Sequence, residues 1–70
     1  MNQQHDPGLA LHREVRAGFI RKGSTFGEWC RQEGVNPSSA RQVVIGSWDG
    51  PKARALRARI IKAAGLEKAA

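Results

Sequence analysis

Three breaks in this chain leave segments whose lengths suit short helices. Each break pairs a glycine that can end a helix with a residue that can begin the next one: Gly23 with Thr25, Gly34 with Pro37, and Gly46 with Pro51. Glycine takes the left-handed conformation past a helix end, and proline is tolerated in the first helical turn. The breaks predict an all-α fold, a small bundle of four short helices, or five, with helices at about 7–22, 26–33, 37–45 and 51–64.

Local capping signals support these boundaries. Asp6-Pro7 has the form of a helix start, with Asp6 as the cap. The run Thr25-Phe26-Gly27-Glu28 has the form of a capping box, and Asn36 stands where the third helix needs a cap. Seventy residues suffice for one domain with a small core. We expect residues 1–6 to form a flexible N-terminal arm, 7–66 the domain, and 67–70 a C-terminal tail.

The second and third predicted helices have the spacing of a helix-turn-helix running from about Thr25 to Ile45. Gly34 supplies the turn, and Cys30 supplies a small residue where the two helices touch. Val35 can fill the space between them. At 100° per residue, the third helix turns Ala40, Val43 and Val44 inward. Trp29 and Cys30 are expected in the core, and Gly18 is expected to permit close packing of a neighbouring helix.

The opposite face of the third helix suits the reading of DNA bases. It carries Ser38, Arg41, Gln42 and Ile45, with Ser39 at its flank. Arginine can donate two hydrogen bonds to a guanine edge, and glutamine can bond an adenine edge in the same bidentate way. Serine can reach a base or a phosphate, and Ile45 can touch a thymine methyl. The competing interpretation is a polar face that only meets solvent.

Residues on both sides of this helix are expected to hold the DNA backbone. They are Arg21, Lys22, Ser24 and Thr25 before it, and Ser47, Trp48, Lys52 and Arg54 after it. Thr25 has the equally good alternative of acting only as a cap, and Trp48 of packing onto the bundle. The net charge of +6 favours a polyanionic partner. Double-stranded DNA is therefore the expected partner.

Composition argues against several other classes of protein. The histidines, His5 and His12, and the single cysteine offer no zinc set, no catalytic pair is evident, and we expect no enzyme activity, metal or cofactor. One cysteine makes no internal disulfide, which is typical of a reducing compartment. No apolar run reaches the ~20 residues of a spanning helix. The expected location is the cytoplasm, in association with the bacterial nucleoid, and no membrane partner is expected.

Residues 12–64 resemble the Ner-type regulators of transposable phages, a branch of the lambda-repressor-like helix-turn-helix proteins. The resemblance is carried by the following segments: His12-Arg13, Ala17-Gly18, Arg31-Gln32-x-Gly34, Pro37, and Trp48 followed by Pro51-Lys52. It requires a one-residue shift in the first helix and a two-residue insertion near Asp49-Gly50. Glu33 stands where the motif usually has an apolar residue, and either fraying outward or pairing with an arginine would accommodate it. The resemblance implies operator binding through helix 37–45 and gene regulation, usually repression.

Three functions stay open at this level. The first is a sequence-specific transcriptional regulator of phage or prophage type, expected to be a repressor. The second is a DNA-architectural or excisionase-like recombination factor that uses the same motif. The third is a protein-interaction module whose partner surface is Ile45, Trp48 and Ile61. A homodimer, including one supported by DNA, is compatible with the first, because such readers commonly bind paired half-sites.

Overall fold

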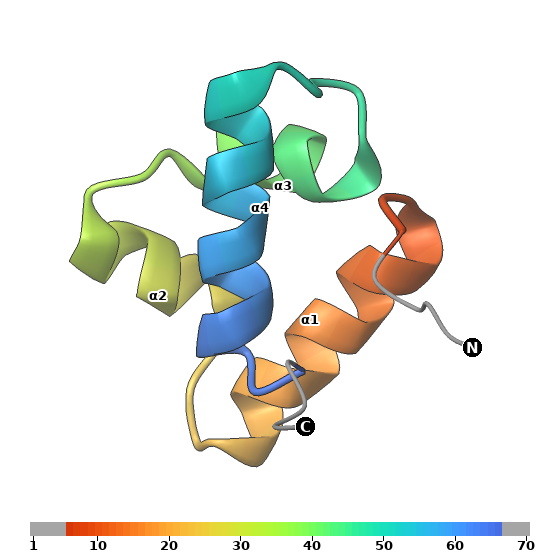
Figure 1. Cartoon of the computed structure of the whole chain (residues 1–70). Helices are drawn as coiled ribbons and strands as arrows, with labels where there is room; N and C mark the ends of the chain where they lie inside the picture. Colours follow the sequence, from red (N-terminus) through yellow and green to blue (C-terminus); the bar gives the residue numbers. More distant parts are fainter. Residues whose placement is uncertain (1–5, 67–70) are drawn as a thin grey trace.

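The computed structural model describes residues 6–66 of the chain. Within them the chain forms four α-helices and no strand: α1 (Leu9–Arg21), α2 (Phe26–Glu33), α3 (Pro37–Ile45) and α4 (Pro51–Ala63) (Figure 1). The all-α fold with four helices is therefore confirmed. Apart from Asp6, the predicted N-terminal arm and C-terminal tail lie outside the described residues.

The capping signals predicted from the sequence form at the start of α2 and in the short loop, residues 34–36, that joins α2 to α3. The backbone N–H of Glu28 donates to Thr25 Oγ1 at 3.1 Å, and Asn36 Oδ1 accepts from the N–H groups of Ser38 and Ser39 at 2.9 and 3.1 Å. Gly34 has a φ of 72°, a conformation that favours glycine, and this allows the Val35 N–H to reach the Cys30 carbonyl at 2.8 Å. Both helices keep their predicted bounds.

The beginning of α1 differs from the prediction. Asp6 does not cap this helix: Gly8 is the N-cap residue, makes no side-chain capping bond, and α1 begins at Leu9. The Gly8 N–H instead donates to the carbonyl oxygen of Val44 at 3.1 Å. The approach to α1 is thus set by a bond to the end of α3, which no local signal encodes. The end of α4 falls at Ala63, one residue earlier than predicted.

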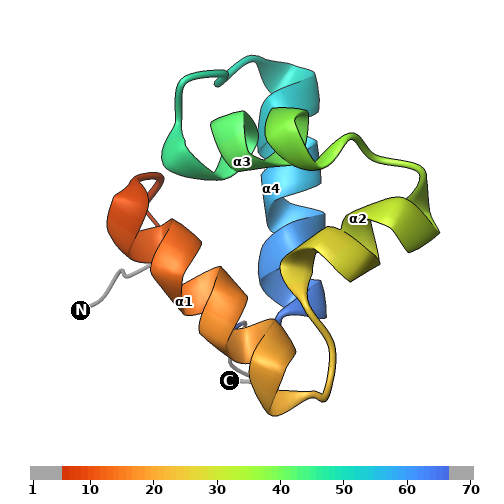
Figure 2. The same cartoon turned by 180° about the vertical axis from the view of Figure 1, so that it is seen from behind.

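The core forms where α3 meets the other three helices. Figure 2 shows α4 behind α3, with α1 and α2 on either side. The buried apolar side chains come from every helix: Leu11, Val15, Phe19, Phe26, Cys30, Ala40, Val43, Val44 and Ile60, with Ala64 just beyond α4. Full burial of a large aliphatic or aromatic side chain contributes about 1.5–3 kcal/mol. The predicted inward face of α3 is confirmed.

Three aromatic rings join α1 to α2. Phe19 lies 5.8 Å from both Phe26 and Trp29, measured between ring centroids. Trp29 is half-buried against the core, as predicted. The guanidinium of Arg59 lies 5.7 Å from the centre of the Trp29 ring and also bonds Glu33 at 2.9 Å. Glu33 is accommodated on the surface by this ion pair with an arginine of α4.

A close approach joins the end of α1 to the end of α4. A Cβ at position 18 would overlap the carbonyl oxygen of Ala64, so this contact requires glycine. Nearby, Lys22 Nζ donates to the carbonyl oxygen of Ala63 at 2.8 Å. The prediction that Gly18 permits close helix packing is confirmed, and the contact brings two segments far apart in sequence together.

Candidate nucleic-acid interface

The outward face of α3 presents the polar side chains that the sequence places there. Ser38 and Arg41 are exposed, while Ser39, Gln42 and Ile45 are half-buried. Within residues 6–66, the side chains of Arg41 and Gln42 make no hydrogen bond or ion pair. Ala40 and Val44, on the inner face, are completely buried. Buried side chains on its inner face therefore hold α3 against the core, while Ser38 and Arg41 on its outer face are exposed to a partner.

Donors from two other elements hold the C-terminal end of α3. The last carbonyls of a helix have no partner inside it. In α3, the carbonyl of Val43 accepts from Arg57 Nε at 2.9 Å, and that of Val44 accepts from the Gly8 N–H at 3.1 Å. The positive charge of Arg57 also faces the negative end of the helix dipole. These bonds fix the position of α3 from α4 and from the start of α1.

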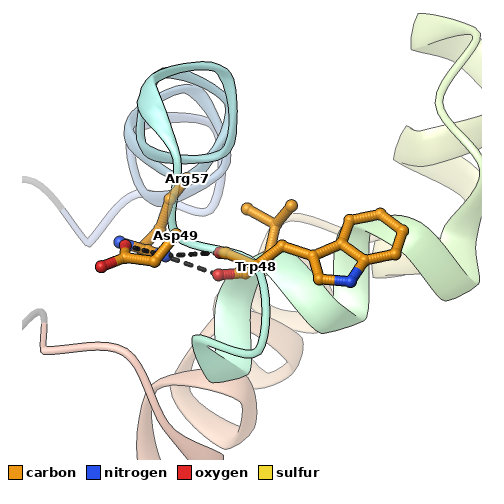
Figure 3. A network of polar contacts seen from close by, with 4 residues as sticks. Trp48, Asp49 and Arg57 are labelled. Carbon is orange, nitrogen blue, oxygen red and sulfur yellow. Dashed lines mark hydrogen bonds and ion pairs between the residues drawn. The ribbon is translucent and has the colours of Figure 1, made fainter.

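Arg57 also organises the loop that follows α3 (Figure 3). Its NH2 group donates to Asp49 Oδ1 at 2.8 Å and to the Trp48 carbonyl at 3.2 Å. The Trp48 side chain points away from this ion pair and is 51% exposed. Trp48 therefore stands at the surface of a loop whose backbone is held in place, rather than in the core.

An open pocket of about 360 Å³ lies at the other end of α3. Three helices line it, with His12, Arg16 and Ile20 from α1, Thr25 with Phe26 and Gly27 from the start of α2, and Pro37, Ser38 and Arg41 from α3. His12 and Arg16 were not among the predicted site residues. Their signal in the sequence is a row with four-residue spacing, 12, 16 and 20, on the side of α1 that does not enter the core.

The pocket is electropositive. Burial, followed by the positive charges of Arg41 and Arg16, lowers the pKa of His12. No carboxylate is among the residues that line the pocket. The edge of the His12 ring meets Phe26, with 6.0 Å between the ring centroids. An anion that entered this pocket would meet two arginines and a histidine without a competing negative charge.

The predicted backbone-contact residues fall into three groups. Thr25 lines the pocket together with Ser38 and Arg41. Lys22 and Ser24 lie nearby in sequence but are engaged within the chain: Lys22 bonds the Ala63 carbonyl, and the Ser24 hydroxyl donates to Glu28 Oε1 at 3.0 Å. The remaining members are all exposed: Arg21, Ser47, Trp48, Lys52 and Arg54. The last four follow the C-terminal end of α3.

Three further observations concern metal ligands, the cysteine and the apolar character of the helices. Residues 6–66 contain no group of three His, Cys, Asp or Glu side chains placed to hold a metal ion. Cys30 is completely buried, and burial raises the pKa of its thiol. None of the four helices has the length and apolar character that crossing a membrane requires.

Comparisons with models of known protein families, with curated proteins and with solved structures find no match to this chain. Its function must therefore be inferred from the side chains arranged around α3.

Proposed function

We propose that this protein binds double-stranded DNA by inserting α3 into the major groove, and that it acts as a sequence-specific transcriptional regulator. The observation that carries the proposal is the outward face of α3, where Arg41 and Gln42 have no intramolecular partner within residues 6–66. An α-helix with its side chains is about 10–12 Å across. This diameter matches the ~12 Å width of the major groove, so α3 can enter it.

The chemistry of this face supports direct reading of bases. An arginine can donate to both O6 and N7 of a guanine, and a glutamine can pair with N6 and N7 of an adenine. Ser38 and Ser39 at the start of α3 are short, so they let the helix approach the groove floor closely. Ile45 lies about one turn beyond Arg41 and offers an apolar contact to a thymine methyl.

Basic groups flank both ends of α3, where the phosphates of a bound groove would lie. The pocket with Arg16 is at the N-terminal end, and the exposed side chains of Lys52 and Arg54 follow the C-terminal end. The net charge of +6 adds a general attraction to DNA. The resemblance of residues 12–64 to Ner-type phage regulators supports repression as the outcome, and a homodimer on paired half-sites is compatible with it, because small operator readers commonly bind in this way.

The test is selection from a random pool of duplex DNA at two salt concentrations, followed by measurement of variants on the selected site. We expect one enriched motif that survives the higher salt. Arg41→Ala should weaken binding to that motif by about 1–3 kcal/mol and relax the preference at one base position. Arg13→Ala is the matched control, because Arg13 is an exposed arginine of α1 that does not line the pocket.

The outcomes separate the possible functions. Equal binding of the Arg41→Ala variant and the parent to selected and random DNA would refute the role of α3 as the reading helix. Salt-sensitive binding without an enriched motif would favour a DNA-architectural or excisionase-like factor. No DNA binding at either salt would favour a protein-interaction module. Of the surface considered for that module, Trp48 is exposed, whereas Ile45 is half-buried and Ile61 packs against the core.

A further inference from the structure

We propose that the pocket between α1, α2 and α3 binds one backbone phosphate of the DNA, and that His12 takes up a proton when this phosphate enters. This inference rests on the proposed function and adds a regulatory property to it: DNA binding should tighten as pH falls. The phosphodiester is held by Arg16 and, once protonated, by His12, while Arg41 at the edge shared with the outward face of α3 adds its positive charge.

The position of the pocket selects a phosphate of the bound duplex. Ser38 and Arg41 belong both to the pocket and to the outward face of α3. Any anion in the pocket therefore lies beside the groove that α3 would enter, where one strand's backbone passes. The pocket is also open, and its volume of about 360 Å³ is near the lower end of the ~300–1,000 Å³ of small-molecule sites. An open site of this size suits one group of an extended polymer.

Neutral donors complete the site. The backbone N–H groups of Phe26 and Gly27 lie in the first turn of α2 and have no acceptor within that helix. Neither donates to another backbone acceptor within residues 6–66. The Thr25 hydroxyl accepts from the Glu28 N–H, which leaves its own proton free to donate. Gly27 has no side chain to cover these amides. They supplement the charged groups, which provide most of the attraction.

The charges around His12 explain why its proton is exchanged on binding. Arg16 faces it from α1 and Arg41 faces it from α3; α2 presents Phe26, Gly27 and Thr25, which carry no charge, and α4 contributes no residue to the pocket. Burial and the two arginines hold the pKa of His12 below its ordinary value of 6.5, so the ring is neutral at neutral pH. A phosphate reverses the local field and raises that pKa.

The sign of the pH effect follows from linkage. Because the pKa of His12 is higher in the complex than in the free protein, affinity is constant above the bound pKa. It increases as pH falls toward the free pKa, and becomes constant again below it. One exchanged proton limits the change to about tenfold in Kd per pH unit. The lower end of the window, set by the free pKa of His12, therefore lies below 6.5.

The experiment measures Kd for the selected DNA site by fluorescence anisotropy between about pH 5.5 and 7.5 at constant salt. The parent should bind several-fold more tightly at the acidic end. His12→Gln should lose the pH dependence, whatever its affinity at the alkaline end. His5→Gln is the matched control, because it removes the other histidine and should keep the full dependence. A His12→Gln variant with the parent's pH dependence would overturn the proposal.

Two further measurements identify the anion. The NMR titration of His12 should give a higher pKa in the DNA complex than in the free protein. Millimolar inorganic phosphate alone should raise it much less, because a free ion lacks the help of the other DNA contacts. An equal rise with inorganic phosphate would overturn the assignment to the DNA backbone. A single neutral methylphosphonate, scanned along the site, should remove the pH dependence of the parent at one position.

Failure of this proposal is distinguishable from failure of the proposed function. If Arg41→Ala relaxes the preference at one base position while His12→Gln leaves the pH profile unchanged, α3 reads DNA but the pocket holds no phosphate. If the parent does not bind DNA at all, both proposals fail.

Discussion

Replacement of Arg57 by methionine should destabilise the fold by about 2–4 kcal/mol. Arg57 is only 7% exposed, and methionine keeps most of its apolar stem. The main loss is the bond to the Val43 carbonyl, because a buried acceptor left without a donor costs about 1–3 kcal/mol. The bonds to Trp48 and Asp49 contribute less: Asp49 is 55% exposed, and water can replace an ion pair of that kind for about 0–1 kcal/mol.

A loss of this size is large for this chain. A domain of 70 residues has a total stability of roughly 4–10 kcal/mol. Urea unfolding followed by circular dichroism should show the lower midpoint, and each kcal/mol should lower Tm by about 4–8 °C. Hydrogen exchange at the N–H groups of Gly46 and Trp48, which both donate to the Gln42 carbonyl, should accelerate because the loop after α3 loses its anchor.

Asp49→Asn separates the ion pair from the buried bond. It keeps the bonds of Arg57 to the two carbonyls and should cost at most about 1 kcal/mol. The reasoning fails if Arg57→Met is as stable as the parent. Replacement of a buried charged group by an apolar one can be neutral, and that result would mean that the methionine packs well enough to offset the orphaned Val43 carbonyl.

Two further predictions concern the core. Gly18→Ala should destabilise the protein by about 1–2 kcal/mol in urea unfolding, because the cost of overlap with the Ala64 carbonyl exceeds the ~1 kcal/mol that alanine gains in a helix. Gly27→Ala should be neutral or stabilising, because its Cβ would meet only the end of the Arg31 side chain at 3.6 Å. Equal effects at the two positions would contradict this prediction. The Cys30 thiol should react with a disulfide reagent at pH 8 only as fast as the protein opens, because the thiol is buried and its pKa is raised. Fast labelling without urea would show that the contact between α2 and α3 is open in solution.

The parts of the fold that local chemistry determines could be predicted from the sequence. The bounds of α2 and α3 follow from Thr25, Gly34 and Asn36, whose bonds lie within a few residues of themselves. The predicted start of α1 was wrong: α1 begins at Leu9, and the Gly8 N–H before it bonds the carbonyl of Val44, which is distant in sequence. Periodicity identifies the side of a helix that faces inward, but it does not identify the partner of a particular backbone group.

The candidate site likewise has one part that the local sequence pattern predicts and another that depends on how distant helices pack. Periodicity alone placed Arg41 and Gln42 on the outward face of α3. The pocket was missed because it needs the relative placement of three helices, and the helix-turn-helix template describes two. The row on α1 that contains His12 and Arg16 was visible in the sequence, but only the packing of α1 against α3 brings it to Arg41. Arg57 shows the limit of such patterns, because it lies in the apolar stripe of α4 and its side chain donates to the carbonyl of Val43, 14 residues earlier in the sequence.

The contact between the ends of α1 and α4 has a consequence for the order in which the molecule assembles. Lys22 and Ala63 are 41 residues apart, so their bond closes the longest loop among the side-chain bonds of residues 6–66. Joining distant segments costs more chain entropy than forming a neighbouring helix pair. We therefore expect helices that are neighbours in sequence to associate first and the contact between the ends of α1 and α4 to form last. A substitution at Gly18 should then leave the folding rate nearly unchanged and act almost entirely by accelerating unfolding.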